Sequence, residues 1–245
     1  MNVIEVDKLS KHFGDFKAVD EISFNVQQGE IFGFLGANGA GKTTAMRILC
    51  GLSYPTSGKA RVSGFDVYKQ QDQIKQHIGY MSQKFSLYDN LTINENIEFF
   101  GGVYGLSRKE IKTRRNELIA RLGLQKEAKQ LVGALPLGWK QKLAFSVAIF
   151  HRPQIVFLDE PTGGVDPLTR RQFWDMIYQA AEDGITLFVT THYMDEAEYC
   201  NRISVMVDGK VEALDSPANL KAKFHGDSME DVFYRLARKA QRNDD

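Results

Sequence analysis

The stretch that decides the fold is FGFLGANGAGKTT, residues 32–44. It matches the pattern G-x-x-x-x-G-K-[ST] between an apolar run, residues 31–35, and a helix-like run, residues 45–49. We expect its glycines, Gly36, Gly39 and Gly41, to adopt positive φ angles and to let successive N–H groups line a concavity for an anion. The sequence therefore predicts a nucleotide-phosphate loop formed by Gly36, Ala37, Asn38, Gly39, Ala40, Gly41, Lys42, Thr43 and Thr44.

The end of this loop carries the groups that would contact phosphate and metal. The helix that begins near Lys42 is expected to direct its positive dipole end at the phosphate. The Lys42 ammonium would reach the β- and γ-phosphates, and the Thr43 hydroxyl would ligate a magnesium ion. A glycine-rich turn alone often serves only to bend the chain, but the strand, lysine and helix here favour phosphate binding.

Length and composition restrict the classes of protein to which this chain could belong. The 245 residues carry 31 Lys and Arg against 31 Asp and Glu, so no net field favours nucleic acid or an anionic membrane. No apolar run approaches the roughly 18 residues of a membrane span, and the start MNVIEVDKLS does not resemble a signal peptide. We therefore expect a cytoplasmic protein. Cys50 and Cys200 fit no metal or redox spacing and are expected to be buried.

The first part of the chain mixes strands and helices. Its apolar patterns predict strands at residues 3–13, 17–26, 59–63 and 78–81. A helix is expected at residues 70–77. From residue 91 to residue 150 the pattern is helical, with one helix starting at Thr92 and another at residues 108–122. We interpret about residues 86–150 as an all-helical subdomain inserted between two strands.

Strand–helix alternation resumes after this block and predicts a mainly parallel sheet with helices on both faces. The expected elements are strands at residues 155–158, 187–189 and 203–207 and helices at residues 167–182 and about 194–200. Residues 226–245 are expected to form a C-terminal amphipathic helix, over residues 228–240, and a frayed polar tail, residues 241–245.

Polar side chains follow three of the predicted strands, where ligands bind in an open parallel sheet. Asp159 is expected to hold the magnesium shell, and Glu160 to orient or deprotonate the water that attacks the γ-phosphate. His192 would bond the γ-phosphate or hold the water and Glu160 in register, and Gln83 would contact the metal or the water. Taken singly, the Asp-Glu pair is more typical of a solvated loop and the histidine of a structural residue, and the phosphate loop upstream favours the catalytic roles.

In this order these residues resemble the nucleotide-binding subunit of an ABC transporter, over about residues 3–220. The resemblance implies an α/β fold: a P-loop NTPase (RecA-like), mainly parallel sheet with an N-terminal antiparallel β subdomain and the inserted helices, in an ABC ATPase domain at residues 1–225. It also implies a homodimer or heterodimer that sandwiches two ATP molecules with Mg²⁺. The aromatic that stacks on adenine matches Phe13, with Val19 beside it, whereas without the family Phe13 would be interpreted as a core residue.

One segment departs from the family pattern. Where the family usually has Leu-Ser-Gly-Gly-Gln, directly before a helix expected at residues 140–150, this chain has Leu135, Pro136, Leu137, Gly138 and Trp139. Pro136 donates no hydrogen bond, so the contacts to the partner's γ-phosphate are expected from the helix end and the N–H groups near Gly138. The alternative is a degenerate signature that dimerises weakly or serves one of two sites. Gly163 replaces the usual Ser, whereas Asp166, the family's dimer-loop residue, is present.

Similar Leu-Pro-Leu-Gly-Trp signatures occur in bacterial ATPases that resemble subunits of ABC-2-type exporters. This resemblance implies ATP hydrolysis that drives separate integral membrane permease subunits, from the cytoplasmic face of the inner or plasma membrane. A groove for a permease helix is expected from Lys84, Phe85, Leu87 and Tyr88 with Phe99 and Phe100, although the last two are as consistent with packing inside the insertion.

Two other functions stay open at the level of sequence. A soluble ABC-type ATPase acting on ribosomes or DNA is disfavoured by the single cassette, the short insertion and the neutral charge, and no nucleic acid is expected as a partner. A regulatory nucleotide binder with little turnover is favoured only by the altered signature.

Overall fold

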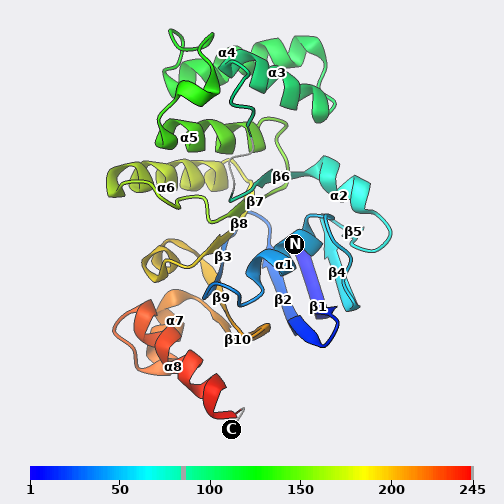
Figure 1. The fold of residues 1–245 in the computed structure, drawn as a ribbon, viewed down its shortest axis with the longest axis vertical. Helices are drawn as coiled ribbons and strands as arrows, with labels where there is room; N and C mark the ends of the chain where they lie inside the picture. The colour runs from blue at the N-terminus through cyan, green and yellow to red at the C-terminus, as the bar shows by residue number, and fades with distance from the viewer. Residues whose placement is uncertain (84–86, 244–245) are drawn as a thin grey trace.

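Two β-sheets form the centre of the protein (Figure 1). The structure, a computed structural model, describes residues 1–83 and 87–243, with side chains through residue 238. The sheets have the strand orders β2-β1-β4-β5 and β10-β9-β3-β8-β7-β6. The strands are β1 (Asn2–Phe13), β2 (Phe16–Gln27), β3 (Ile31–Gly36), β4 (Ser57–Val62), β5 (Phe65–Asp66), β6 (Ile78–Met81), β7 (Ile155–Asp159), β8 (Thr186–Thr191), β9 (Arg202–Val207) and β10 (Lys210–Asp215).

Helices pack around these sheets. The α-helices are α1 (Lys42–Leu49), α2 (Gln71–His77), α3 (Ile93–Val103), α4 (Arg108–Leu122), α5 (Leu137–Ala148), α6 (Pro167–Glu182), α7 (Pro217–Phe224) and α8 (Met229–Asn243). Two 3-10 helices are η1 (Val132–Ala134) and η2 (Met194–Tyr199). Among the described residues, no helix has the length and apolar content needed to cross a bilayer.

The smaller sheet is antiparallel, as the sequence predicts. β1 pairs with β2 on one side and with β4 on the other, and the β1–β2 turn has Gly14 at φ +59°. The larger sheet is mainly parallel, because β3 runs parallel to β8 and β9 and β7 runs parallel to β6 and β8. Only β10 is antiparallel in this sheet within the described residues, and it was not predicted. The expected α/β class is therefore confirmed.

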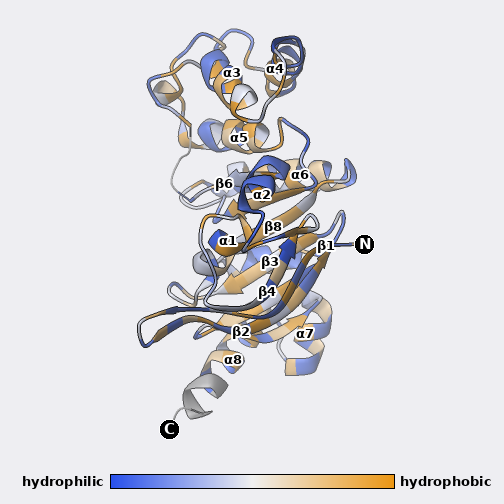
Figure 2. Cartoon of the chain, turned by 90° about the vertical axis from the view of Figure 1, so that its right-hand side faces the viewer, coloured by the Kyte–Doolittle hydropathy of each residue, from blue (hydrophilic) through white to orange (hydrophobic). Residues whose placement is uncertain are grey.

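The inserted residues are helical, and their helix starts follow local capping chemistry. Thr92 and Ser107 each form a capping box, with Glu95 and Glu110 respectively, so α3 and α4 begin where the sequence predicts. Helices α3, α4 and α5 lie at one end of the molecule, and α7 and α8 lie at the other (Figure 1). α4 carries mostly hydrophilic residues, whereas the strands of the large sheet are mostly hydrophobic (Figure 2).

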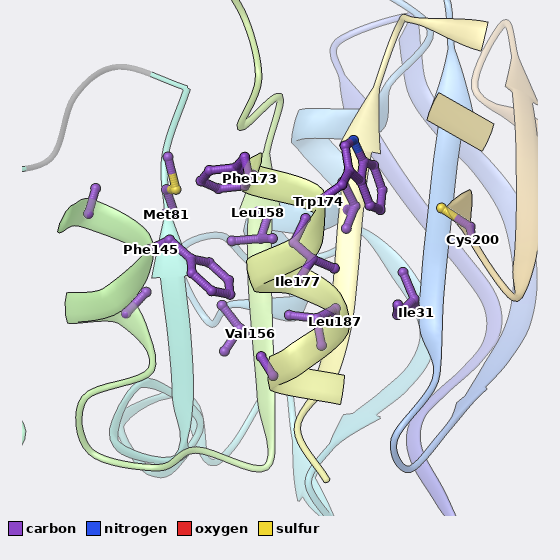
Figure 3. Close-up of a cluster of buried hydrophobic side chains, with 14 of the residues drawn as sticks. Ile31, Met81, Phe145, Val156, Leu158, Phe173, Trp174, Ile177, Leu187 and Cys200 are labelled. Atoms are coloured by element: carbon purple, nitrogen blue, oxygen red, sulfur yellow. The ribbon is translucent and has the colours of Figure 1, made fainter. Parts of the chain in front are cut away.

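A buried hydrophobic cluster fixes α5 and α6 on the large sheet. Phe145 of α5 and Phe173 of α6 meet edge to face, with ring centroids 5.3 Å apart, over Leu158 of β7 (Figure 3). Burial of such side chains stabilises the fold by about 1.5–3 kcal/mol each. Because the strands are held from both faces, the loops at their carboxyl ends start from fixed positions. Cys50 and Cys200 are free and buried, as expected.

Three helices differ from the sequence prediction in ways that bear on the fold. The helix expected at residues 140–150 begins at Leu137, because Pro136 serves as its N-cap with an extended backbone. The segment near Met194 is a 3-10 helix rather than an α-helix. The C-terminal helix α8 continues to Asn243 rather than fraying from residue 241.

Candidate functional site

The phosphate loop connects β3 to α1, and glycine is required at its positions for two different reasons. Gly39 and Gly41 adopt φ angles of +84° and +101°, which side chains rarely tolerate. Gly36 does not have a positive φ, so that part of the prediction is wrong. Gly36 is required for space instead, because a Cβ there would lie 2.5 Å from the carbonyl oxygen of Met206 in β9. Ala37, Asn38 and Gly39 are exposed at the tip of the loop, and Ala40 is buried.

Lys42 begins α1 and is directed back into the loop. Its ammonium donates hydrogen bonds to the carbonyl oxygens of Gly36, at 2.8 Å, and Ala37, at 3.0 Å. Only 5% of the residue is exposed, and this burial lowers the pKa of Lys42, an effect that Glu160 and Asp159 partly offset. A buried cation therefore lies inside the loop, where an anion could be bound.

Asp159 at the end of β7 forms the acidic side of the site. The sheet register pairs it with Thr190 of β8, whose hydroxyl donates to Asp159 Oδ1 at 2.7 Å. The Thr43 hydroxyl lies 3.5 Å from the same oxygen, and Thr44 follows it in α1. Burial raises the pKa of the Asp159 carboxyl. A carboxylate disfavoured by burial, beside a hydroxyl, has the donor chemistry that suits a magnesium ion.

The structure places the three predicted catalytic residues together. Glu160 Oε2 accepts a hydrogen bond from the Gln83 amide at 2.8 Å and lies 3.1 Å from His192 Nδ1. Its other carboxylate oxygen lies 3.9 Å from the Lys42 ammonium. The Glu160 backbone has φ +48°, a strained conformation for a residue with a side chain, and its N–H bonds to the carbonyl oxygen of Thr190 at 3.1 Å. The Gln83 amide, which was expected at the metal or the attacking water, thus contacts the Glu160 carboxylate.

The small number of protein oxygens at the site is consistent with a magnesium ion. Among the described residues, no group of three or more His, Cys, Asp and Glu side chains could hold a metal. Magnesium, however, is usually bound through one or two protein oxygens together with phosphate oxygens and water. Thr43 and Asp159 supply that smaller set, and Gln83 would need to release Glu160 to join it.

The two residues expected at the adenine differ in exposure. Phe13 ends β1 with 58% of its surface exposed, and the Lys11 ammonium lies 5.1 Å from its ring centroid. It is therefore not a core residue and is free to stack on a base. Val19 is fully buried, because it belongs to the hydrophobic cluster under the small sheet. Val19 therefore has no exposed surface, and its place beside the adenine stays a prediction.

The signature segment forms the first turn of α5. Leu135 is buried, Pro136 is exposed, and Leu137 and Trp139 are 46% and 37% exposed. The first N–H groups of a helix lack partners within it. Those of Trp139 and Lys140 bond to the Pro136 carbonyl oxygen, so the donors that this end of α5 offers are the N–H groups of Leu137 and Gly138. Gly138 packs against α6, because a Cβ there would lie 2.6 Å from Cγ2 of Thr169.

The dimer-loop residues are held in place by local bonds. Asp166 caps α6 by accepting from the backbone N–H of Thr169, at 2.9 Å, and from its hydroxyl, at 2.6 Å. The carbonyl oxygen of Gly163 accepts from the Gln141 amide at 3.1 Å. A Cβ at Gly163 would meet nothing closer than the Glu160 carbonyl oxygen at 3.4 Å, so space is not the reason for this glycine.

Three polar residues near the site were missed by sequence reasoning: Gln141, Thr190 and Glu196. Thr190 precedes His192 by two residues at a strand end, and that position could have identified it. Gln141 and Glu196 gave no such signal, because their partners, Gly163 and two threonines, come from distant parts of the chain.

The expected partner groove is described only in part. Lys84 and Phe85 lie outside the described residues, and Leu87 is buried. Tyr88, Phe99 and Phe100 form an aromatic cluster with ring centroids 5.1–6.1 Å apart, in which Tyr88 and Phe99 are nearly half exposed. The cluster therefore both packs on α3 and presents an apolar surface.

Comparisons with known proteins agree with this geometry. The family model described as ABC transporter matches residues 19–163, more than half of the chain. Over 239 residues the chain is 50% identical to the probable multidrug ABC transporter ATP-binding protein YbhF of Escherichia coli K12, covering 96% of this chain and 41% of that relative. It is 35% identical to the linearmycin resistance ATP-binding protein LnrL of Bacillus subtilis strain 168, covering 93% of this chain and 73% of LnrL.

A solved structure extends the agreement to the fold. The dimeric ATP-binding cassette MJ0796, bound to ADP and phosphate, superposes with a TM-score of 0.77 and 26% identity, over 87% of this chain and 98% of that one. The antiparallel β subdomain, the mainly parallel sheet and the helices are thus those of the ABC ATPase fold, a P-loop NTPase fold. This chain belongs to the ABC transporter family.

Proposed function

We propose that this chain binds and hydrolyses ATP to power a separate membrane permease, as the subunit of an ABC exporter. The observation that carries the proposal is the position of the Glu160 carboxylate. It lies 3.1 Å from His192 and 3.9 Å from Lys42, at the mouth of the phosphate loop. A carboxylate next to a phosphate site and an imidazole is suited to orient an attacking water.

The other residues have complementary roles in this proposal. Lys42 and the N–H groups of the loop bind the phosphates, and Phe13 stacks on the adenine. Thr43 and Asp159, with Gln83, would hold Mg²⁺, which neutralises charge on the phosphates. The Gln83 amide bonds to the Glu160 carboxylate, and His192 Nδ1 lies 3.1 Å from it without a hydrogen bond, so both side chains stand beside this carboxylate before ATP enters. Such preorganisation lowers the barrier to hydrolysis.

A second subunit would complete the site. In the proposed ATP sandwich, the end of α5 with Leu135, Pro136, Leu137, Gly138 and Trp139 faces the partner's γ-phosphate, and Asp166 faces the partner. The MJ0796 cassette is dimeric with ADP and phosphate, and this supports the arrangement. The exposed Leu137 and the free N–H groups of α5 fit a contact with phosphate, even though Pro136 offers no hydroxyl. The dimer is either a homodimer or a heterodimer.

The permease would dock on the cluster of Tyr88, Phe99 and Phe100. Val103, also on α3, is 61% exposed and extends this apolar surface. YbhF and LnrL are named for multidrug transport and linearmycin resistance, and this supports export from the cytoplasmic face of a membrane. The chain covers 41% of YbhF, so its transported substrate does not follow from that relative. The proposed division is an ABC ATPase domain at residues 1–225, with helices inserted at about 86–150, and a C-terminal segment at 226–245.

Glu160→Gln tests the hydrolytic role. The amide keeps the size of the side chain and loses the carboxylate that orients water, so ATP should still bind while turnover falls at least about 100-fold and dimer accumulates. Steady-state phosphate release measures turnover, and size-exclusion chromatography with ATP measures the dimer. Glu117→Gln, on the exposed surface of α4, is the matched control. Unchanged hydrolysis in Glu160→Gln would contradict the assignment.

A regulatory ATP binder with little turnover is the second candidate, because Pro136 removes the hydroxyl that the family uses at the signature. Purified protein with its permease in lipid separates the two functions. Stimulated ATPase activity supports the exporter subunit, and ATP binding without stimulation supports the regulator. Stimulation by ribosomes or DNA would instead support the third possibility, a soluble ATPase.

A further inference from the structure

A buried carboxylate lies beneath the pair formed by Glu160 and His192. Glu196, in the 3-10 helix η2, has no exposed surface. Each of its two oxygens accepts a hydrogen bond from a threonine hydroxyl: Oε1 from Thr162, at 2.5 Å, and Oε2 from Thr191, at 2.7 Å. Both threonines are also buried. One carboxylate thus joins two loops that are about thirty residues apart in the sequence.

The bond to Thr191 controls the direction of His192. Thr191 is the last residue of β8, and its hydroxyl oxygen also accepts from the backbone N–H of Tyr193 at 3.0 Å. The chain is therefore folded around His192, with the residues on both sides tied to one hydroxyl. Because that hydroxyl donates to Glu196, the position of the imidazole depends on the carboxylate beneath it.

The bond to Thr162 controls the loop after Glu160. Thr162 follows Glu160 by two residues, and the backbone N–H of Gly163 bonds to the Glu160 carbonyl oxygen at 3.2 Å. The same loop leads to Asp166 at the start of α6. Glu196 therefore holds the loops that carry Glu160 and His192, and it sets the distance between them.

Nearby charge compensates for the burial of Glu196. The guanidinium of Arg170, on α6, lies 3.7 Å from Glu196 Oε1 and 3.5 Å from Asp195 Oδ2, and 4.4 Å from the ring centroid of Tyr193. A buried carboxylate is costly unless it is paired and hydrogen-bonded, and this one has two hydroxyl donors and a cation. An arrangement of this kind is held in one geometry, because any displacement leaves a buried charge without partners.

We propose that Glu196 is a positioning residue for ATP hydrolysis, which sets the placement of His192 against Glu160 through Thr191 and Thr162. The proposal rests on the proposed ATPase function. Glu196 does not touch the nucleotide itself, so its loss should change the rate of turnover and leave ATP affinity unchanged.

Substitutions of Thr162 test the proposal, because Thr162 contacts neither His192 nor the phosphate loop in the bonds described above. Thr162→Val removes the hydroxyl and keeps the shape, and we expect kcat to fall about tenfold with KM for ATP within about twofold. Thr162→Ser restores the hydroxyl and should keep kcat within about twofold of wild type. The proposal is overturned if the valine variant retains wild-type kcat, or if the serine variant is as slow as the valine variant.

Thr186→Val is the matched control. Thr186 is a fully buried threonine of β8 at the other end of the strand, where its hydroxyl accepts from the Gly29 N–H at 2.9 Å. It loses a buried hydrogen bond as Thr162→Val does, so the two variants should lose comparable thermal stability. Only Thr162→Val should lose turnover. If both variants lose turnover equally, the effect is general destabilisation and the proposal fails.

A second measurement does not depend on activity. Nuclear magnetic resonance of the histidine side chains, with His192 assigned by a His192→Ala variant, reports the surroundings of the imidazole. We expect the His192 signals to shift in Thr162→Val and to stay unchanged in Thr186→Val and Thr162→Ser. An unshifted signal in Thr162→Val would refute the positioning role. If the signal shifts in Thr162→Val but the wild-type protein shows no ATP turnover, the positioning role stands and the ATPase function is refuted instead.

Discussion

Replacement of Lys42 by Met tests the phosphate loop most directly. Methionine keeps the unbranched apolar stem, one atom shorter, and removes the ammonium that bonds to the carbonyl oxygens of Gly36 and Ala37. In the nucleotide-free protein two contributions oppose each other, because these bonds are lost while the cost of burying a cation is removed. We therefore expect the variant to fold, and its defect to appear only when nucleotide is added.

The size of this defect follows from the charge that is lost. A hydrogen bond to a charged group contributes about 1.5–3 kcal/mol. Losing one near the upper end of this range, about 2.7 kcal/mol, between Lys42 and phosphate should weaken nucleotide affinity by roughly 100-fold. At a nucleotide concentration of about 100 times the wild-type Kd, binding stabilises wild type by about 2.7 kcal/mol and the variant by about 0.4 kcal/mol. For a chain of this length the Tm should rise by roughly 5–11 °C in wild type and by about 1–2 °C in the variant.

Differential scanning fluorimetry against ATP and Mg²⁺ measures these shifts, with both proteins in the Glu160→Gln background so that hydrolysis does not consume the ligand. Lys210→Met is the control, because Lys210 is exposed and lies at the edge of the large sheet. It should show the full wild-type shift. If Lys42→Met also shows the full shift, the ammonium does not contact phosphate and the interpretation of the loop is wrong.

Two further substitutions test the signature and the acidic side of the site. Leu137→Asp places a carboxylate in the exposed first turn of α5, where it should stabilise the helix and repel the partner's γ-phosphate. The ATP-dependent dimer should therefore disappear in size-exclusion chromatography. Leu137→Asn, the control, should keep the dimer. Burial raises the pKa of Asp159 in the folded protein. The protonated carboxyl therefore stabilises the fold at a pH below its ordinary pKa, and this stabilisation is lost as the pH rises through the pKa of the folded state. At neutral pH and without nucleotide, Asp159→Asn should therefore melt above wild type, and it should lose the Mg²⁺-dependent part of nucleotide stabilisation; melting below wild type would contradict the raised pKa.

The signature is better tested at Leu137 than at the neighbouring glycine. Any side chain at Gly138 would meet the methyl group of Thr169, at 2.6 Å from the Cβ, so a defect there would combine a packing change with a charge. Leu137 is nearly half exposed and lacks this ambiguity.

Most strands and helices could be predicted from the sequence because local patterns specify them. α4 and α6 occupy the predicted residues, since each has a clear N-cap, Ser107 and Asp166. The β9–β10 hairpin and α7 were missed although signals existed, namely the Asp208-Gly209 turn and Ser216 before Pro217. β5 has only two residues, too few for a pattern.

The site was predictable in composition and not in its contacts. Residues at the ends of apolar strands identified Gln83, Glu160 and His192, and the structure places the Gln83 amide 2.8 Å and His192 Nδ1 3.1 Å from the same Glu160 oxygen. The pairing of Asp159 with Thr190 depends on β7 lying next to β8, and no local sequence pattern specifies the order of strands in a sheet. Val19 was predicted beside the base, but how far its side chain is buried depends on what packs over β2, which the sequence does not show.

The two cysteines give this protein a practical property for spectroscopy. Cys50 and Cys200 are buried, and burial raises the pKa of both thiols, so neither presents a reactive thiolate to a maleimide reagent in the folded state. One new cysteine at an exposed position such as Glu117 on α4 could thus carry a fluorophore or a spin label while the native sequence is otherwise kept. Paired with a second label on α8, at the other end of the molecule, it would record how far the two ends move during each catalytic cycle.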